Sequence, residues 1–368
     1  MSTPHQAAPA LQAATPWDEI ALAIRLDQPI RAHDLRGLDA RHRALAGAIF
    51  NQTDLAGASF AGADLARVRF IDCDLRGADF GNADLDHASF VKCDLSQARL
   101  AARNLRHVSW IDCNLTASHW EHAQVQACTI VNGTLDHARF DGSALTRCTL
   151  LNSRFDRTSV AGATLRQCVI SPADWRTVNL AGLQAEGTIF SNANFEGQLM
   201  SGLRLPRCSM QAAELGHADL AGADLSHVNL YRARLAHANL SNAVAPHALL
   251  LEAVLTDTSL ADAQLDGAIF QKARLHGCRL DGARLRASIW NRSHHDNVSF
   301  RRADLSHARF EQVEGDHVDF GDATLDHAQF HNASLCETNF RGASQHRVGR
   351  TDPARLAAEA RTLALENE

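Results

Sequence analysis

The fold is decided by residues 48–90, which read AIF NQTDL AGASF AGADL ARVRF IDCDL RGADF GNADL DHASF. Leu or Phe returns at every fifth position from Phe50 to Phe90, and a small residue stands two positions before each of them. Five residues advance an α-helix by about 500°, so these side chains would share no helical face. On a straight strand they would alternate between two faces. The spacing therefore predicts short extended segments separated by bends, wound into a solenoid whose neighbouring turns share one core.

The five-residue phase continues along most of the chain. At numbers ending in 5 or 0 from Leu35 to Phe340, the residue is large and apolar with five exceptions, which are Ala40, Ala185, Ala245, His295 and Gly315. No net insertion or deletion shifts the phase anywhere in this range. An unbroken repeat of this length favours one elongated domain over two ordinary ones.

The repeated motif resembles that of the pentapeptide-repeat family, whose pattern is A(D/N)LXX. Copies stand at Ala63-Asp64-Leu65, Ala223-Asp224-Leu225 and Ala303-Asp304-Leu305, and the resemblance covers about residues 33–343. It implies an all-β solenoid, a right-handed, four-sided parallel β-helix with four pentapeptides per coil. Such a rod would have about fifteen coils and a length of ~70 Å at the usual strand spacing. We expect a mobile N-terminus and capping helix over residues 1–32, the β-helix over 33–344 and a C-terminal helix over 345–368.

The cysteines support four sides and argue against a metal or disulfide framework. Eight of the nine occupy the small position of the repeat, and Cys73, Cys93 and Cys113 are twenty residues apart, as expected if they stack on neighbouring coils. A buried cysteine at such a position most often replaces alanine, and the CxxC spacing of zinc sites is missing. Free buried thiols fit a reducing compartment, so a cytoplasmic location is expected, with no signal peptide in residues 1–15.

Both ends of the chain carry helix signals. Thr15-Pro16 reads as an N-cap followed by a first-turn proline, which predicts a helix to about Leu26 that covers the first coil; residues 1–15 are expected to be mobile. Asp352-Pro353 predicts a second helix through about Leu365, with Leu356, Ala360 and Leu363 in one apolar stripe. This helix either closes the last coil or pairs with another subunit, and the resemblance implies a dimerisation role for such a segment.

Two stretches break the pattern. Residues 172–206 include Ala185 at a large position, Leu183 and Leu203 at small positions and the polar Gln198, which predict a local bulge, bend or loop. A tolerated packing irregularity is favoured over a functional protrusion or kink. Residues 291–296 place His295 where a large apolar residue belongs, so the coil must either loop out or bury an imidazole. A loop is the expected solution.

A candidate interaction surface is drawn from three segments. Residues 244–254 carry apolar side chains at outward positions, a basic segment over 272–302 precedes an acidic one over 304–326, and the C-terminal helix has its apolar stripe. Scattered surface residues and an ordinary solvated face are the alternatives. The residues selected are Leu249, Leu251, Val254, Arg274, Arg279, Arg284, Leu356 and Leu363.

Histidine is abundant, and many copies share one position. Twelve of the twenty stand two residues after a centre, and four pairs are twenty residues apart, namely His87/His107, His217/His237, His227/His247 and His307/His327. Stacked pairs would lie at metal-bridging distance, although a simple fit of histidine to a corner is the favoured explanation. No metal ligand, cofactor site or catalytic residue is assigned, because phosphate-binding loops, HExxH and nucleophile elbows are missing from the sequence.

Surface binding is therefore the expected activity. The net charge of −6 arises from 42 acidic and 36 basic residues that are interspersed, which demands neither a nucleic acid nor a membrane as partner. We expect a non-enzymatic bacterial protein–protein interaction scaffold or adaptor, for which the resemblance allows an accessory role in a secretion system. The alternative, also implied by the resemblance, is a DNA mimic that binds DNA gyrase or topoisomerase IV. Partner identity stays open, and a homodimer is one option.

Overall fold

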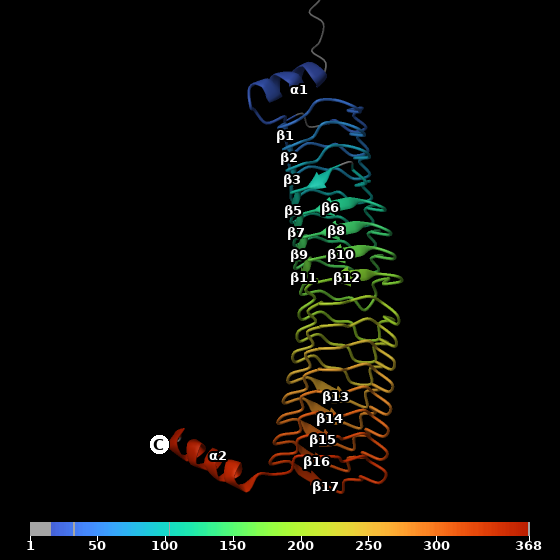
Figure 1. Ribbon diagram of the computed structural model, residues 1–368. Coiled ribbons are helices and arrows are strands. Elements are labelled where there is room, and N and C mark those ends of the chain that lie inside the picture. The colour runs from blue at the N-terminus through green and yellow to red at the C-terminus, as the bar shows by residue number, and fades with distance from the viewer. Residues whose placement is uncertain (1–15, 32–33, 103, 367–368) are drawn as a thin grey trace, which may run out of the picture.

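The chain forms a long four-sided rod. The computed structural model describes residues 16–31, 34–102 and 104–366, so the expectations for residues 1–14 and for Thr15 as an N-cap fall outside the described residues. The chain winds as a right-handed parallel β-solenoid of about 14 coils (Figure 1). The predicted fold class is confirmed.

In the part of the chain that the structure describes, two helices flank many very short strands. Helix α1 comprises Pro16–Arg25 and helix α2 comprises Pro353–Glu366. The first sheet contains, in spatial order, β1 (Ile49–Asn51), β2 (Arg69–Ile71), β3 (Ser89–Val91), β5 (Ser109–Ile111), β7 (Thr129–Val131), β9 (Thr149–Leu151) and β11 (Val169–Ser171). The second contains β12 (Gln184–Glu186), β10 (Thr164–Arg166), β8 (Ala144–Thr146), β6 (Gln124–Gln126) and β4 (Leu105–Arg106). The third contains β13 (Val254–Thr256), β14 (Arg274–His276), β15 (His294–Asp296), β16 (Glu314–Asp316) and β17 (Ser334–Cys336).

Every pairing joins residues twenty apart. In the first sheet Phe50 lies opposite Phe70, and outside the strands isolated parallel bridges keep the same register as far as Gln329 and Gly349. We number the faces in the order in which the chain visits them. Face 1 carries the first sheet, face 2 the third sheet and face 4 the second sheet, whereas face 3 is joined by isolated bridges such as Ser59 to Asp79.

The core consists of stacked side chains from opposite faces. On face 1 the rings of Phe50 and Phe70 stack with centroids 5.0 Å apart, and on face 3 those of Phe60 and Phe80 stack at 5.2 Å. Across the core Phe50 meets Phe60 edge to face at 6.4 Å. All four rings are fully buried, and each contributes about 1.5–3 kcal/mol through burial alone. Over residues 50–90 the five-residue phase thus produces a ladder of interlocked aromatic rings.

The corners of the coil explain the histidines. Residues two positions after a centre adopt the left-handed conformation, with φ of 68° at Gly57 and 57° at His87. Histidine, asparagine and aspartate enter this region more readily than most residues other than glycine. The twelve histidines at this position share a positive φ, and they are His42, His87, His107, His122, His137, His217, His227, His237, His247, His307, His317 and His327.

The bulge, bend or loop predicted for residues 172–206 is wrong, and the alternative of a tolerated packing irregularity agrees with the structure. The register continues through this stretch, where Asp174 bridges to Asn194, and Leu183 and Leu203 are buried. The buried amide of Gln198 donates hydrogen bonds to the carbonyl oxygens of Val178, at 3.0 Å, and of Trp175. A polar side chain is tolerated there because the backbone satisfies it.

The loop predicted at His295 is also wrong, because the imidazole is buried. His295 lies in β15 with no exposed surface, 3.0 Å from the hydroxyl of Ser293 and edge-on to Trp290. Burial, with a smaller effect of His294, lowers the pKa of His295 to about 3, so the ring is neutral at neutral pH. On the next coil Gly315 lies opposite His295, and the space a Cβ would need is filled by the Leu335 side chain, 2.9 Å away.

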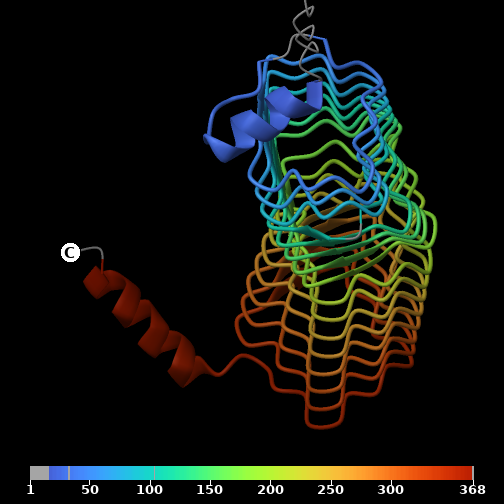
Figure 2. The same cartoon turned by 90° about the horizontal axis from the view of Figure 1, so that it is seen from above.

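The two ends of the rod are covered differently. Helix α1 lies across the first coil, with Ile20 1% exposed and the Arg43 guanidinium 4.4 Å above the Trp17 ring (Figures 1 and 2). At the other end Phe340 is 36% exposed, and α2 leads away from the rod (Figures 1 and 2). Neither described helix is both long and apolar enough to cross a bilayer.

Candidate functional site

The residues selected for the interaction surface lie on different faces. Leu249 and Leu251 flank a centre on face 1, and Val254 and Arg274 pair with each other on face 2. Arg279 belongs to face 3, where it bridges to Ser259, and Arg284 belongs to face 4, where it bridges to Gln264. Leu356 is half-buried in α2, and Leu363 lies in the part of α2 where only the backbone is described. The structure therefore brings together two pairs and separates the others.

Face 1 carries an outward row of aliphatic side chains, which sequence reasoning missed. Each residue lies opposite the next in the strand ladder of the first sheet. Ile111, at the middle of the row, is 37% exposed, and the others are half-buried. We call these five residues the aliphatic row, namely Ile71, Val91, Ile111, Val131 and Leu151.

The same face is apolar further along the rod. Leu249, Ile269 and Ile289 are bridged in succession, and Leu251 lies beside Leu249 across the buried Leu250. On the other faces of the described coils, large aliphatic side chains at outward positions stand singly, as Leu199, Val244 and Val254 do. The apolar row could have been found in the sequence, but only by comparing residues twenty positions apart, beginning at Ile71.

The basic residues selected from the C-terminal third are mostly paired. Arg284 contacts Asp266 at 2.8 Å, and Arg279 lies 3.8 Å from Asp281. Exposed pairs of this kind contribute little to stability, but they reduce the charge offered to a partner. Arg274 is exposed on β14. The basic segment is therefore a solvated surface that contains ion pairs, and it does not form a continuous cationic patch.

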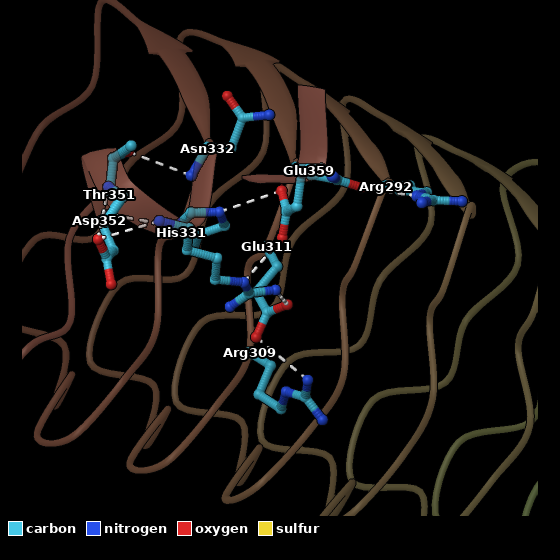
Figure 3. A network of polar contacts seen from close by, with 11 residues as sticks. Arg292, Arg309, Glu311, His331, Asn332, Thr351, Asp352 and Glu359 are labelled. Carbon is cyan, nitrogen blue, oxygen red and sulfur yellow. Dashed lines mark hydrogen bonds and ion pairs between the residues drawn. The ribbon is translucent and has the colours of Figure 1, made fainter. Parts of the chain in front are cut away.

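A polar network attaches α2 to the side of the rod (Figure 3). The Asp352 carboxylate caps α2 by accepting the N–H of Ala354 at 2.9 Å, which confirms the predicted N-cap. The backbone N–H of Asp352 donates to His331 Nδ1 at 3.2 Å. Nδ1 is therefore the acceptor, so Nε2 carries the proton and donates to Glu359 Oε2 at 3.3 Å.

An arginine completes this network. Arg355 donates to Glu311 at 2.9 Å and to Glu359 at 2.7 Å. Arg309 contacts the other oxygen of Glu311 at 3.1 Å. The hydrogen bond from Arg355, followed by that from Arg309, lowers the pKa of Glu311 below its usual value. The first turns of α2 are thus held by charge-assisted hydrogen bonds instead of apolar packing.

The last coil leaves an open apolar end. β17 pairs with β16 on one side and ends its sheet, and the Phe340 and Leu335 side chains are only partly covered. A cavity of about 500 Å³ opens beside them. Six apolar and three polar residues line it, namely Leu325, Phe330, Ala333, Leu335, Phe340, Gln345, Val348, Arg350 and Thr351.

Most of the cysteine side chains are part of the hydrophobic core. All nine cysteines are free, and eight are buried as predicted, whereas Cys336 is exposed. The Cys73 thiol donates to the carbonyl oxygen of Ile71 at 3.3 Å. Burial raises the pKa of Cys208 to about 12 and that of Cys278 to about 11. These two groups stay protonated at neutral pH and are poor nucleophiles.

Comparisons with known proteins agree with this architecture. A family model described as pentapeptide repeat region matches residues 63–140, and one described as pentapeptide repeats (8 copies) matches residues 34–70, 44–77, 208–244, 248–286, 278–314 and 316–344. Together the matches cover more than half of the chain. A comparison with curated proteins found no match.

Solved structures of repeat proteins were also found. HetL from the cyanobacterium Nostoc sp. strain PCC 7120, a pentapeptide repeat protein involved in heterocyst differentiation regulation, is 22% identical, with 61% of this chain and 87% of that chain covered and a TM-score of 0.21. Full-length QnrB1, a plasmid-mediated fluoroquinolone resistance protein, is 16% identical, with 65% and 99% covered and a TM-score of 0.25. Rfr23 from the cyanobacterium Cyanothece 51142 is 16% identical, with 53% and 88% covered and a TM-score of 0.16.

Proposed function

Because the chain belongs to the pentapeptide-repeat family, we propose that it is a non-enzymatic bacterial scaffold or adaptor that binds another protein along face 1 of its rod. The observation that carries this proposal is the aliphatic row, five outward apolar side chains on successive coils. Single exposed apolar residues are normal on any protein, but an aligned row on one face of four is typical of a binding surface.

The geometry suits an extended contact. At the usual spacing of parallel strands the aliphatic row is about 19 Å long, comparable to a few turns of a partner helix or a short strand. The rigid coils beneath it hold the side chains in fixed register, so little conformational entropy is lost on binding. The partner is expected to present a complementary apolar strip with polar margins.

Affinity capture with matched variants tests this proposal. Tagged wild-type protein, a Val91→Lys/Val131→Lys variant of the aliphatic row and an Ala61→Lys/Ala161→Lys control on face 3 are incubated with a Gram-negative bacterial lysate, and bound proteins are identified by mass spectrometry. A protein retained by the wild type and the control but lost from the aliphatic-row variant supports the proposal. Equal retention by all three overturns it.

We also propose that two copies associate through their open C-terminal ends. The partly exposed Phe340 and Leu335, the adjacent cavity and the outer edge of β17, the last strand of its sheet among the described residues, form a largely apolar surface. An uncovered coil end of this kind favours pairing with another chain. A second copy presents the same surface, which satisfies the self-complementarity of a two-fold contact.

A DNA mimic that binds a type II topoisomerase is the second candidate. Asp34, Asp54, Asp74 and Asp94 follow one another in a bridged row on face 2, a regular acidic array. Arg36 pairs with Asp34 at 2.8 Å and Arg76 pairs with Asp74, which offsets part of the negative charge. The scaffold is therefore favoured. Inhibition of DNA supercoiling by gyrase at stoichiometric protein would move the DNA mimic to first place.

The cytoplasm is the proposed location, supported by eight buried free thiols. An accessory role in a secretion system stays a prediction, and secretion components among the captured proteins would support it.

A further inference from the structure

One corner of the rod gathers three metal-ligand groups. His87 and His107 occupy the same corner on adjacent coils, both with φ of 57°, and their rings stack with centroids 4.5 Å apart. Asp86 precedes the first of them, and its Oδ1 lies 3.5 Å from His107 Nδ1 and 4.0 Å from His87 Nε2. One ligand atom from each residue lies within 4.8 Å of the other two.

The Asp86 carboxylate is the distinctive part of this group. Its Oδ1 is buried and receives no hydrogen bond. A buried carboxylate oxygen without a donor is costly, because it has lost water without gaining a partner. A cation held beside the two imidazoles would compensate for that loss. The histidines themselves are exposed, so an ion can reach the site from solvent.

The backbone positions these side chains before any ion binds. The N–H of His87 donates to the carbonyl oxygen of Arg106 at 3.0 Å, and that of His107 donates to Gln126 at 3.1 Å. The same corner holds Arg67 on the coil before and Ala127 on the coil after, so the group contains only two imidazoles. Its size is thereby limited to a single ion.

From this geometry we infer that Asp86, His87 and His107 form a binding site for one divalent transition metal ion, with Zn²⁺ the best fit. Two neutral imidazoles and one carboxylate are ligands that Zn²⁺ accepts, with about 2.0–2.2 Å to each ligand atom and water in the fourth position. Ligand atoms around such an ion are about 3.3 Å apart, so the present distances need to shrink modestly. Rotation of the exposed rings from their stacked orientation supplies this change, since such rotamer motions are fast.

Another stacked pair in the same rod provides a matched control. His227 and His247 stack at 5.1 Å with nearly parallel rings, but the residues before them are Ser226 and Pro246, which offer no carboxylate. The pair has the same corner conformation and the same spacing along the chain. A difference between the two pairs therefore reports the contribution of Asp86 and of the complete ligand set.

Metal titration of the full chain tests the inference. The purified protein is stripped with a chelator and titrated with Zn²⁺ in competition with a chromophoric chelator, and with Co²⁺ to record its visible absorption. We expect one Zn²⁺ to bind more tightly than any others, and a tetrahedral Co²⁺ spectrum. Asp86→Asn and His107→Ala are each expected to weaken this site at least tenfold, whereas His227→Ala/His247→Ala leaves it unchanged.

Circular dichroism and the melting temperature of each metal-free variant establish that it is folded. Asp86→Asn preserves the shape of the side chain and is the variant least prone to disturb the coil. Unchanged Zn²⁺ affinity in both Asp86→Asn and His107→Ala would overturn the inference. So would an equal loss in the His227→Ala/His247→Ala control, because binding would then belong to surface histidines in general.

Discussion

The first coils and the last coils of the rod follow one repeat and differ in how completely it is realised. Around residues 48–90 every centre is Leu or Phe, the rings are fully buried and α1 covers the exposed edge. Over residues 290–349 the centres include His295 and Gly315, Phe340 is 36% exposed, and α2 is attached by ion pairs. The same five-residue repeat thus has a capped N-terminal end and an incompletely covered C-terminal end.

This difference shows that the repeat determines which side chains point inward, but not how much each of them contributes to the stability of the fold. A residue at a centre position points inward in either region, yet its contribution depends on whether another coil lies above and below it. Regions with fewer buried contacts open more easily, so the last coils are expected to open before the first ones. The contrast can be tested by substitutions at equivalent positions of the two regions.

The largest contrast is expected from two phenylalanines in the same row of face 3. Phe80 stacks on Phe60 with no exposed surface, so Phe80→Ala should lower the free energy of unfolding by about 3–5 kcal/mol. Phe340→Ala should cost less than half as much, because its ring is partly exposed and leaves no closed cavity. Chemical denaturation of both variants measures the ratio, and equal losses would erase the distinction between the regions.

A buried imidazole should make the last coils acid-sensitive. The pKa of His295 is lowered to about 3 by burial, whereas in the unfolded chain it is near 6.5. The unfolded state therefore binds a proton first, and stability falls as the pH drops from about 6.5 towards 3. His295→Leu should gain about 1–3 kcal/mol by removing the unpaired Nδ1, and its advantage should grow between pH 7 and pH 5.

Thermal melts of the wild type and His295→Leu at several pH values separate the effect of the buried imidazole from the titration of carboxylates, which both proteins share. A constant difference between the two proteins across the range would contradict a buried neutral imidazole. Replacing an ordinary centre in the first coils, as in Leu85→Met, provides the control and should show no dependence on pH.

Association through the open end should respond to a single charge. Phe340→Glu places a carboxylate on the apolar end surface, and we expect it to weaken dimerisation at least tenfold, about 1.4 kcal/mol or more. Sedimentation equilibrium of the wild type and the variant measures the dissociation constant. Lys92→Glu, a charge change at a corner of the first coils, should leave the dissociation constant unchanged. A monomeric wild type at all accessible concentrations would refute end-to-end pairing.

The smallest effect is expected at the attachment of α2. Arg355→Ala removes two ion pairs on a half-exposed side chain, so it should loosen only the attachment of α2 and leave the melting of the rod unchanged. The pKa of Glu311 is lowered mainly by Arg355. The attachment is therefore complete above the ordinary pKa of glutamate and weakens as the pH falls below it. Hydrogen exchange of α2 against that of α1 gives the measurement.

The sequence predicted the interior of the molecule far better than its surface. A centre such as Phe60 must be apolar because coils pack on both sides of it, so a five-residue period suffices to find it. The burial of His295 was missed because the core accommodates an imidazole there only with the help of Ser293 beside it and of Gly315 on the next coil. Gln198 was missed for a similar reason, since distant carbonyl oxygens satisfy its amide.

The candidate sites were harder to predict because they depend on residues twenty apart. The aliphatic row is recognisable only when Ile71 and Ile111 are placed on one face, and the outward positions of a single repeat look ordinary. The His87/His107 pair was visible from its spacing, but the buried oxygen of Asp86 that distinguishes it was not. The lateral course of α2 follows from contacts of His331 and Arg355 that no local pattern encodes.

The constant twenty-residue register also makes the rod a ruler. Removal of one coil from its middle, for example residues 211–230, would join equivalent positions and leave every remaining side chain on its own face. The distance between the corner at His87 and the open end at Phe340 would shorten by one strand spacing, about 4.8 Å. Insertions and deletions of whole coils therefore adjust reach in fixed steps, so that the separation of two bound partners is set by chain length alone.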